Sequence, residues 1–314
     1  AHQQLDYAVS QGVNFLDAAE MYPVPPRAET YGFTETYIGE WLKHQQRDKV
    51  IVATKIAGPG RHLKWVRDGG NAIDRINVKQ AVDDSLKRLQ TDYIDLYQIH
   101  WPDRNVPLFG NKVFDPNQER ETVPISEQLS IFADLIKEGK IRYIGLSNET
   151  PWGIATFSSV SKQLGLPKVV SIQNAYNLLN RVFDWTFAEA SYRENIGLLA
   201  YSPLAFGYLT GKYLHGKPEN TRISLFEGFG QRYNKPIVSE AVAAYVEIAN
   251  KYKLTPASLA LAFVRSRWFV SSTIIGATTL EQLQENLESI DVVLDEEILA
   301  ELDAVHTRYR NPAP

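Results

Sequence analysis

Residues Asn14–Tyr22 read NFLDAAEMY, and the interpretation of the whole chain starts from this stretch. The short apolar run predicts a buried strand over residues 13–17 that ends at Asp17. Tyr22 comes five positions after Asp17. We therefore expect Tyr22 in the loop after the strand, where its phenol can point back toward the carboxylate.

Two later apolar segments also end in a polar residue. Val50–Thr54 leads to Lys55, and Ile94–Ile99 leads to His100. Parallel strands of a barrel all end on one face, and enzymes with this fold keep their chemistry there. If the three strands share a sheet, an acid, a phenol, an amine and an imidazole converge.

The composition is that of a globular protein with room for a large core. The chain has 314 residues, 44% of them hydrophobic, a net charge of −4 and no cysteine. The missing cysteines exclude disulfides, thiol catalysis and thiolate metal sites. No basic surface suggests nucleic acid, and no run of about 18 apolar residues predicts a membrane span. We expect a cytoplasmic protein with no metal site, and the sequence leaves its oligomeric state open.

Strand and helix patterns alternate along the chain. Seven apolar segments are each followed by a helical pattern, and one more helical pattern precedes the first. This predicts a parallel α/β sheet, and eight such units close a (β/α)8 TIM barrel. A doubly wound open sheet is the alternative, which the lack of a glycine-rich dinucleotide turn disfavours. We expect one domain over residues 1–314, a barrel whose first strand precedes this sequence.

The expected boundaries follow from the periodicity and from the turn residues. Strands are expected over residues 13–17, 50–54, 94–99, 141–146, 169–172, 196–200 and 273–275. Helices are expected over residues 2–11, 34–43, 77–89, 126–138, 151–164, 184–194, 238–252, 255–266, 279–289 and 295–306.

The segments around the four convergent residues resemble the catalytic set of the aldo-keto reductases. They read LDAAEMY at 16–22, ATK at 53–55 and QIHW at 98–101. The resemblance covers nearly the whole chain, including KIRYIGLSN at 140–148 and YSPL at 201–204, and extends to the potassium-channel β-subunit branch. It implies a TIM barrel and an NADP(H)-dependent carbonyl reductase. The family begins with a hairpin and a glycine-rich first strand, which we expect to precede this sequence.

The chemistry of the four residues can also be read without the family. A phenol with a pKa near 10 is a poor proton donor at neutral pH, and a neighbouring ammonium such as Lys55 would favour the phenolate of Tyr22. Lys55 in turn needs the carboxylate of Asp17 to stay charged when buried. His100 can donate a hydrogen bond that orients a substrate carbonyl. The hydride must come from a cofactor.

The resemblance implies a nicotinamide site at the later strand ends. Ser147, Asn148 and Gln173 are expected to hold the carboxamide of the nicotinamide through their hydroxyl and amide groups. Tyr201 is expected to stack on the nicotinamide face. Asp17 is counted both as a catalytic residue and as a cofactor contact.

The adenosine half of NADP(H) is expected on the loops that follow. The resemblance matches Lys212 and Arg222 to the cations that contact the 2′-phosphate in the potassium-channel β subunits. The alternative is that both are ordinary solvated loop residues. The other expected cofactor contacts are Ser202, Pro203, Leu204, Gly207, Gly276, Thr278, Gln282, Glu285 and Asn286.

The substrate pocket is expected to contain Tyr22, His100 and Trp101. An aromatic pocket mouth suits aldehydes and quinone-like carbonyls better than sugars or phosphorylated compounds. A second function class stays open, a protein that uses bound NADP(H) as a redox readout and docks a partner. A barrel isomerase or hydrolase is a third and weaker reading, because no metal-ligand cluster is present.

Overall fold

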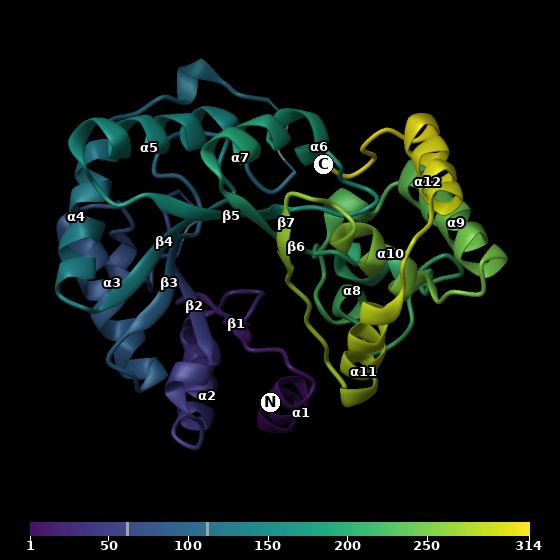
Figure 1. Ribbon diagram of the computed structural model, residues 1–314, viewed down its shortest axis with the longest axis horizontal. Helices are drawn as coiled ribbons and strands as arrows, with labels where there is room; N and C mark the ends of the chain where they lie inside the picture. The colour runs from purple at the N-terminus through teal and green to yellow at the C-terminus, as the bar shows by residue number, and fades with distance from the viewer. Residues whose placement is uncertain (61–62, 111–112) are drawn as a thin grey trace. The chain divides into compact units, whose positions relative to one another are not determined.

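Parallel strands and helices alternate in the structure, a computed structural model that describes residues 1–60, 63–110 and 113–314 (Figure 1). The chain divides into two units, Ala1–Gln173 with Arg193–Ile196 and Asn174–Tyr192 with Gly197–Pro314. The predicted α/β class with parallel strands is confirmed, and it is consistent with a (β/α)8 barrel. The single domain over residues 1–314 stays a prediction.

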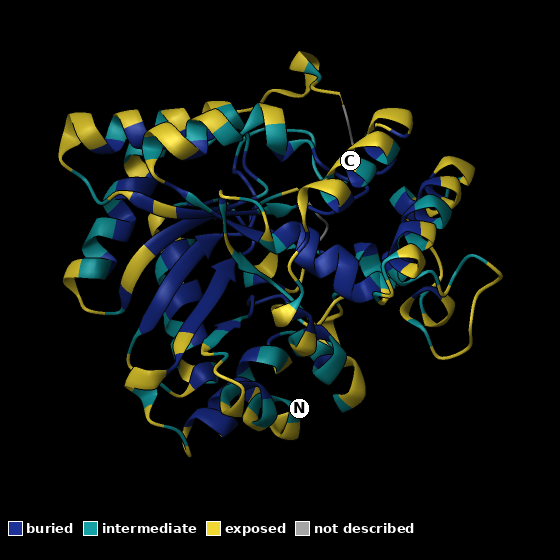
Figure 2. Ribbon diagram, turned by 45° about the vertical axis from the view of Figure 1, so that its right-hand side comes forward, coloured by how far each residue is buried: buried dark blue, intermediate teal, exposed yellow. Residues whose placement is uncertain are grey.

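In the first unit, each strand pairs in parallel with the next strand along the chain. Every position of β3 is buried, as its nearly continuous apolar run predicts. Figure 2 shows several strands that are largely dark blue and helices that are blue on one side and yellow on the other. The strands are β1 (Phe15–Asp17), β2 (Ile51–Ile56), β3 (Ile94–Ile99), β4 (Ile141–Ser147) and β5 (Val169–Ala175).

The helices of the first unit follow the predicted ranges within a few residues. They are α1 (His2–Ser10), α2 (Phe33–Leu42), α3 (Arg75–Leu89), α4 (Ile125–Lys137) and α5 (Pro151–Leu164). The expected start of α3 at residue 77 is too late, because this helix begins at Arg75. Asp74 is the cap, because its carboxylate accepts a hydrogen bond from the Asn77 backbone N–H at 2.8 Å.

A charged cluster ties β2, β3 and β4 near the starts of these strands. Asp95 in β3 accepts hydrogen bonds from Arg47 at 2.7 Å, from Arg142 at 2.9 Å and from the Val52 N–H at 3.0 Å. The two guanidinium groups also lie over the Tyr93 ring, at 3.9 and 3.8 Å from its centroid. Charge-assisted hydrogen bonds and cation–π contacts thus reinforce one end of the sheet.

In the second unit, β6 (Gly197–Tyr201) pairs in parallel with β7 (Val270–Thr273). The predicted strand over residues 273–275 is placed too late, because the ladder with β6 already involves Val270 and Ser272. The helix predicted over residues 184–194 is two helices. The helices are α6 (Phe183–Thr186), α7 (Ala188–Glu194), α8 (Arg222–Leu225), α9 (Pro236–Lys251), α10 (Pro256–Arg265), α11 (Leu280–Glu288) and α12 (Glu296–Arg308).

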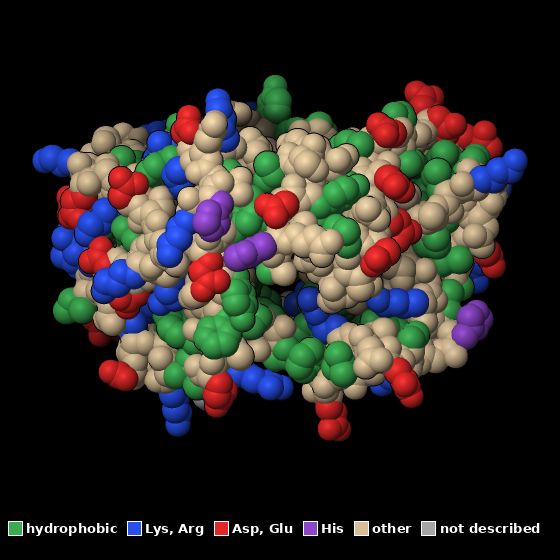
Figure 3. All heavy atoms as spheres, turned by 90° about the horizontal axis from the view of Figure 1, so that it is seen from below, with side chains coloured by type: hydrophobic (Ala, Val, Ile, Leu, Met, Phe, Trp, Pro, Cys, Tyr) green, Lys and Arg blue, Asp and Glu red, His purple; other side chains and the backbone are tan. Residues whose placement is uncertain are grey.

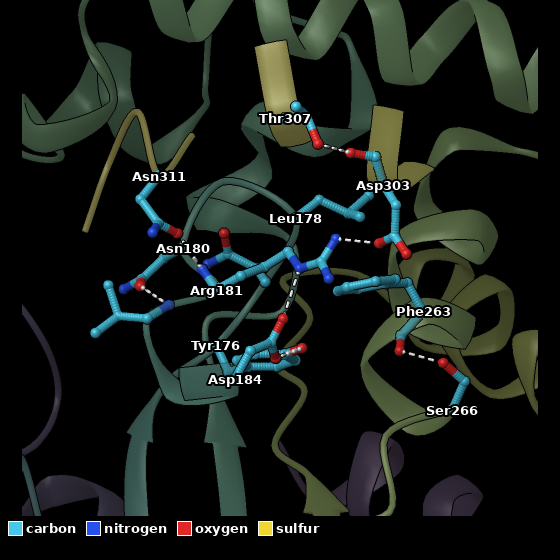
Figure 4. Close-up of polar contacts among 12 residues, drawn as sticks. Tyr176, Leu178, Asn180, Arg181, Asp184, Phe263, Ser266, Asp303, Thr307 and Asn311 are labelled. Atoms are coloured by element: carbon cyan, nitrogen blue, oxygen red, sulfur yellow. Dashed lines mark hydrogen bonds and ion pairs between the residues drawn. The ribbon is translucent and has the colours of Figure 1, made fainter. Parts of the chain in front are cut away.

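Arg181 organises the segment after β5 (Figure 4). Its guanidinium donates to Asp184 at 2.8 Å and to Asp303 at 2.7 Å, and its backbone N–H donates to Asn311 Oδ1 at 2.7 Å. The Tyr176 hydroxyl donates to Asp184 at 2.6 Å. This network joins α12 and residue 311 to the segment that follows β5.

Charged side chains of both signs are scattered over the face shown in Figure 3. Among the residues that the structure describes, no helix combines the length and the apolarity needed to cross a membrane.

Candidate active site

Three neighbouring strands of the first unit carry three of the predicted catalytic residues. Asp17 is the last residue of β1, Lys55 lies next to the end of β2, and His100 directly follows β3. The parallel register pairs Asp17 with Ala53 and Lys55 with Gln98. The strand ends therefore bring these side chains to the same edge of the sheet.

A buried ion pair lies at the centre of this group. Lys55 Nζ is 2.6 Å from Asp17 Oδ2, and the two side chains are 0% and 7% exposed. Lys55 also donates to the Ala18 carbonyl at 2.7 Å. Burial lowers the pKa of the Lys55 ammonium, and the charge of Asp17 opposes that effect. Asp17 is therefore the partner that most strongly opposes the effect of burial on the Lys55 pKa.

Two amide side chains orient the carboxylate from its other side. Gln98 and Gln173 donate to Asp17 Oδ1 at 3.0 and 2.9 Å. Gln173 Nε2 also lies 3.3 Å from Gln98 Oε1. Both oxygens of Asp17 are thus engaged by donors, which fixes the orientation of the carboxylate.

Tyr22 reaches the ion pair through a tight turn. Its backbone N–H donates to the Ala19 carbonyl at 2.9 Å. Lys55 Nζ lies 5.1 Å from the centroid of the Tyr22 ring. The His100 ring meets the Tyr22 ring edge-on, with centroids 5.6 Å apart. The structure therefore brings all four predicted catalytic side chains together.

The predicted nicotinamide residues of the first unit lie beside the catalytic residues. Asn148 donates to the His100 carbonyl at 2.8 Å, and Ser147 donates to the Gln173 carbonyl at 2.8 Å. Asn148 has a left-handed backbone with φ of 51°, which asparagine tolerates better than most residues. Their contact with a carboxamide stays a prediction.

Trp101 lies next to His100, with ring centroids 4.9 Å apart, and is 1% exposed. Its indole N–H donates to the Pro59 carbonyl at 2.9 Å. A Cβ on Gly58 would come within 2.6 Å of the Trp101 carbonyl oxygen, so glycine is required for this close approach. The position of Trp101 at the substrate pocket stays a prediction.

In the second unit, the loop after β6 carries the predicted cofactor contacts. Tyr201 ends β6, and Ser202 has a φ of 55°. Gly207 has a φ of 91°, and a Cβ on it would lie 2.9 Å from Lys212 Cε. The Lys212 stem therefore packs over this glycine. The intervening predicted contacts are Pro203, which is buried, and Leu204, which is half-buried.

Both predicted phosphate-binding cations are exposed side chains of the second unit. Lys212 Nζ lies 5.2 Å from the centroid of the Tyr213 ring. Arg222 is the first residue of α8, and its guanidinium carbon lies 5.6 Å from the centroid of the Phe229 ring. Aromatic neighbours support both stems, and both side chains reach solvent.

The predicted contacts after β7 cluster around the start of α11. Gln282 Oε1 accepts hydrogen bonds from the Thr278 backbone N–H at 3.1 Å and from its hydroxyl at 3.0 Å. Gly276 is exposed, and a Cβ built on it would meet nothing within 4 Å. Glu285 is half-exposed on α11, whereas Asn286 is 7% exposed.

Comparison with protein families matches this chain to the aldo/keto reductase family over residues 1–307. The chain belongs to the aldo/keto reductase family. The resemblance seen in the sequence is thereby confirmed. An aldo/keto reductase is an oxidoreductase that acts on small molecules, and members of the family generally use NAD(P)H.

Curated aldo/keto reductase relatives span nearly the same length. The Tas protein of Escherichia coli K12 is 52% identical over 317 residues, covering 100% of this chain and 91% of that protein. An L-glyceraldehyde 3-phosphate reductase of E. coli O157:H7 is 30% identical, covering 94% and 80%. A putative voltage-gated potassium channel subunit β of Schizosaccharomyces pombe is 29% identical, covering 96% and 82%.

Sequence reasoning missed three residues of this aldo/keto reductase site. Gln98 could have been noticed as an amide within a strand of otherwise mostly apolar residues. Glu20 is 0% exposed and forms an ion pair with Arg67. Glu20 could have been noticed in the sequence as a carboxylate between Ala19 and Met21, where an apolar residue would be expected. Arg67 lies in a polar loop and gives no signal of its own.

Proposed function

We propose that this aldo/keto reductase uses NADPH to reduce aldehyde or ketone carbonyls to alcohols, with Tyr22 as the proton donor. The observation that carries the proposal is the buried Lys55–Asp17 ion pair beside the Tyr22 and His100 rings. A solvated lysine or a capping aspartate would not need full burial, two amide donors and an aromatic partner.

Each side chain has a distinct task in the proton transfer. The Tyr22 hydroxyl donates its proton to the carbonyl oxygen of the substrate, which becomes the hydroxyl of the alcohol. The Lys55 ammonium stabilises the negative charge left on the phenol oxygen. Asp17 keeps Lys55 charged, and Gln98 and Gln173 hold Asp17 in place. Tyr22 thus transfers the proton, and the other four side chains support it electrostatically or hold these groups in place.

His100 orients the substrate in this proposal. Its ring lies edge-on to Tyr22 at 5.6 Å between centroids, so a carbonyl oxygen held by His100 would also be close to the phenol. His100 is 7% exposed, which limits its exchange with bulk water. The His100 and Tyr22 rings, with the buried Trp101 ring packed against His100, give this part of the site an aromatic character, which favours apolar aldehydes and quinone-like carbonyls as substrates.

The residues present fit a nicotinamide dinucleotide. When bound, the cofactor supplies the hydride, which no side chain can donate. In the first unit, Ser147, Asn148 and Gln173 offer hydroxyl and amide groups beside Asp17, the chemistry that a carboxamide requires. These groups would fix the orientation of the ring that faces the substrate.

The second unit supplies groups suited to the adenosine half. Lys212 and Arg222 are exposed cations, which suit the doubly charged 2′-phosphate that distinguishes NADPH from NADH. Gly276 leaves open space where a side chain would stand, and Thr278 and Gln282 add hydroxyl and amide groups. We assign the pyrophosphate to the loop from Ser202 to Gly207.

The test is a turnover assay with the purified protein. NADPH absorbance is followed with a panel of aromatic aldehydes, aliphatic aldehydes and quinones, and the protein is assayed for bound NADP(H) after purification. Catalytic loss of NADPH with formation of the matching alcohol supports the proposal. Tight NADPH binding without turnover of any carbonyl would refute it in favour of a cofactor-dependent redox sensor.

A further inference from the structure

Glu20 is a fully buried carboxylate for which the proposed chemistry has no task. It lies two residues before Tyr22, inside the turn that carries the phenol. Its Oε1 accepts a hydrogen bond from the Ala57 backbone N–H at 2.6 Å. Its Oε2 forms the ion pair with Arg67 and lies 3.4 Å from the Tyr31 hydroxyl. The Tyr22 turn is thereby fixed to the end of β2.

Arg67 gathers three parts of the first unit around this carboxylate. Besides Glu20, its guanidinium donates to the Ala57 carbonyl and to Asn71 Oδ1, both at 3.3 Å. Its own side chain is 3% exposed. The pair therefore joins the Tyr22 turn, the residue after β2 and a more distant part of the segment between β2 and α3.

Apolar contacts extend the effect of this ion pair to the catalytic side chains. Leu63 and Val66, from the segment that contains Arg67, belong to a buried cluster with Met21 and Trp101. Tyr22 packs against this cluster. Movement of the segment that contains Arg67 would therefore shift the Tyr22 phenol and the Trp101 ring.

A buried ion pair contributes little net stability compared with apolar residues of similar volume, so its presence here suggests a geometric role. We propose that Glu20 is a positioning residue for Tyr22: through Arg67 it latches the Leu63–Asn71 segment against the Tyr22 turn and holds the phenol at the distance that proton transfer requires. The inference rests on the proposed carbonyl reduction and deepens it. In this proposal the Glu20–Arg67 ion pair, called the latch below, affects the binding of the carbonyl substrate and the proton transfer to it. It does not affect the binding of the cofactor.

The same unit contains a matched control. Glu35 is also 0% exposed and forms an ion pair with Arg88 at 2.6 Å. That pair joins α2 to α3, and Glu35 accepts a hydrogen bond from Thr54 at 2.5 Å. It has similar burial and charge and makes no hydrogen bond or ion pair to Glu20 or Arg67. The Glu35 charge raises the pKa of Lys55, so the control removes Glu35 and Arg88 together and leaves the net charge near Lys55 unchanged.

The experiment compares Glu20→Gln with Arg67→Met and Glu35→Gln with Arg88→Met, each as a double variant that leaves no lone buried charge. In the latch variant, kcat for an aldehyde should fall about 10²-fold, since misplacement by about 1 Å has an effect of that size. KM for the aldehyde should rise, and the Kd for NADPH should stay within about threefold of the parent value, a change of less than 1 kcal/mol. In the control variant, kcat, the KM for the aldehyde and the Kd for NADPH should each stay within about threefold of the parent value.

Arg67→Lys keeps the charge and provides a milder test if the double variant does not fold. It should lower kcat by less than the roughly 10²-fold expected of the double latch variant, because an ammonium can still reach Glu20. Equal losses in the latch and control variants, or a latch variant with parental kcat and aldehyde KM, would overturn the proposal.

Hydrogen exchange separates failure of the latch from failure of the proposed function. Faster amide exchange at residues 19–22 and 63–71 in the latch variant, but not in the control, supports the latch even if the parent reduces no carbonyl. Unchanged exchange in these segments overturns it, whatever the activity.

Discussion

Replacing Asp17 by asparagine tests the central charge pair of the site. Asp17 Oδ2 faces Lys55 at 2.6 Å, and Oδ1 accepts hydrogen bonds from Gln98 and Gln173. Asparagine has one oxygen and one NH2 group. If the oxygen faces Lys55, the NH2 group opposes two amide donors; if it faces the amides, the NH2 group opposes the ammonium. Neither orientation restores the native contacts.

The size of the expected effect follows from the burial of the Asp17 and Lys55 side chains. Removal of one partner of a buried pair costs about 3–5 kcal/mol of stability, and part of this is recovered if Lys55 loses its proton. The variant lowers the pKa of Lys55 further, because burial then acts without the opposing charge of Asp17. A neutral Lys55 no longer supports Tyr22, so we expect reduction to fall by roughly 10²–10⁴ at neutral pH.

The assay is the pH dependence of kcat in both proteins. Because reduction requires the protonated ammonium, the rate declines as pH rises through the lowered pKa of Lys55, and this decline should begin at lower pH in Asp17→Asn. Asp95→Asn is the matched control, since Asp95 is a buried carboxylate with three donors near the starts of the strands. The control should lose stability and keep the parental pH profile. A parental profile in Asp17→Asn would refute the role of the pair.

Three further outcomes are expected. Tyr22→Phe should lower reduction by roughly 10²–10⁴ with nearly unchanged NADPH binding, measured by initial rates and fluorescence titration; retention of most activity would remove Tyr22 as the proton donor. Lys212→Ala with Arg222→Ala should weaken NADPH binding by about 2–5 kcal/mol and leave NADH binding nearly unchanged; equal weakening of both cofactors would contradict phosphate recognition. Burial lowers the pKa of His306 to about 4. The pKa of His306 in the folded protein is thus lower than its value of about 6.5 in the unfolded chain. As the pH falls from the unfolded to the folded pKa, the folded protein therefore loses up to about 3 kcal/mol of stability. In His306→Gln, urea unfolding should show a smaller acid loss, and an equal loss would contradict this linkage.

The convergence of the four candidate side chains could be predicted from the sequence because neighbouring parallel strands end at the same edge of the sheet. Asp17, Lys55 and His100 could be placed from three apolar runs, and Tyr22 from its distance to Asp17. Gln98 and Arg67 could not, because their contacts depend on the register of β3 and on the path of a long loop. The start of α3 was misplaced for a local reason, since Asp74 and Asn77 are both good capping residues and periodicity does not choose between them.

The cofactor residues show where sequence reasoning stops. Gln173 was expected to hold a carboxamide, and the structure shows its amide donating to Asp17. The same nitrogen also donates to Gln98 Oε1 at 3.3 Å, so both of its hydrogens are used within the protein. These partners depend on side-chain geometry that no sequence pattern contains. Lys212 and Arg222 lie in exposed positions where charge alone does not identify a ligand.

The Asp95 cluster has a consequence for laboratory evolution of this enzyme. It fastens β2, β3 and β4 near their starts, whereas Lys55, His100 and Ser147 lie at the other ends of the same strands. Libraries that vary the loops after these strands would therefore leave the Asp95 fastening untouched. The stability that its contacts provide would offset part of the destabilisation caused by mutations that change the substrate preference. Strengthening that distant end first would widen the range of loop sequences that still fold.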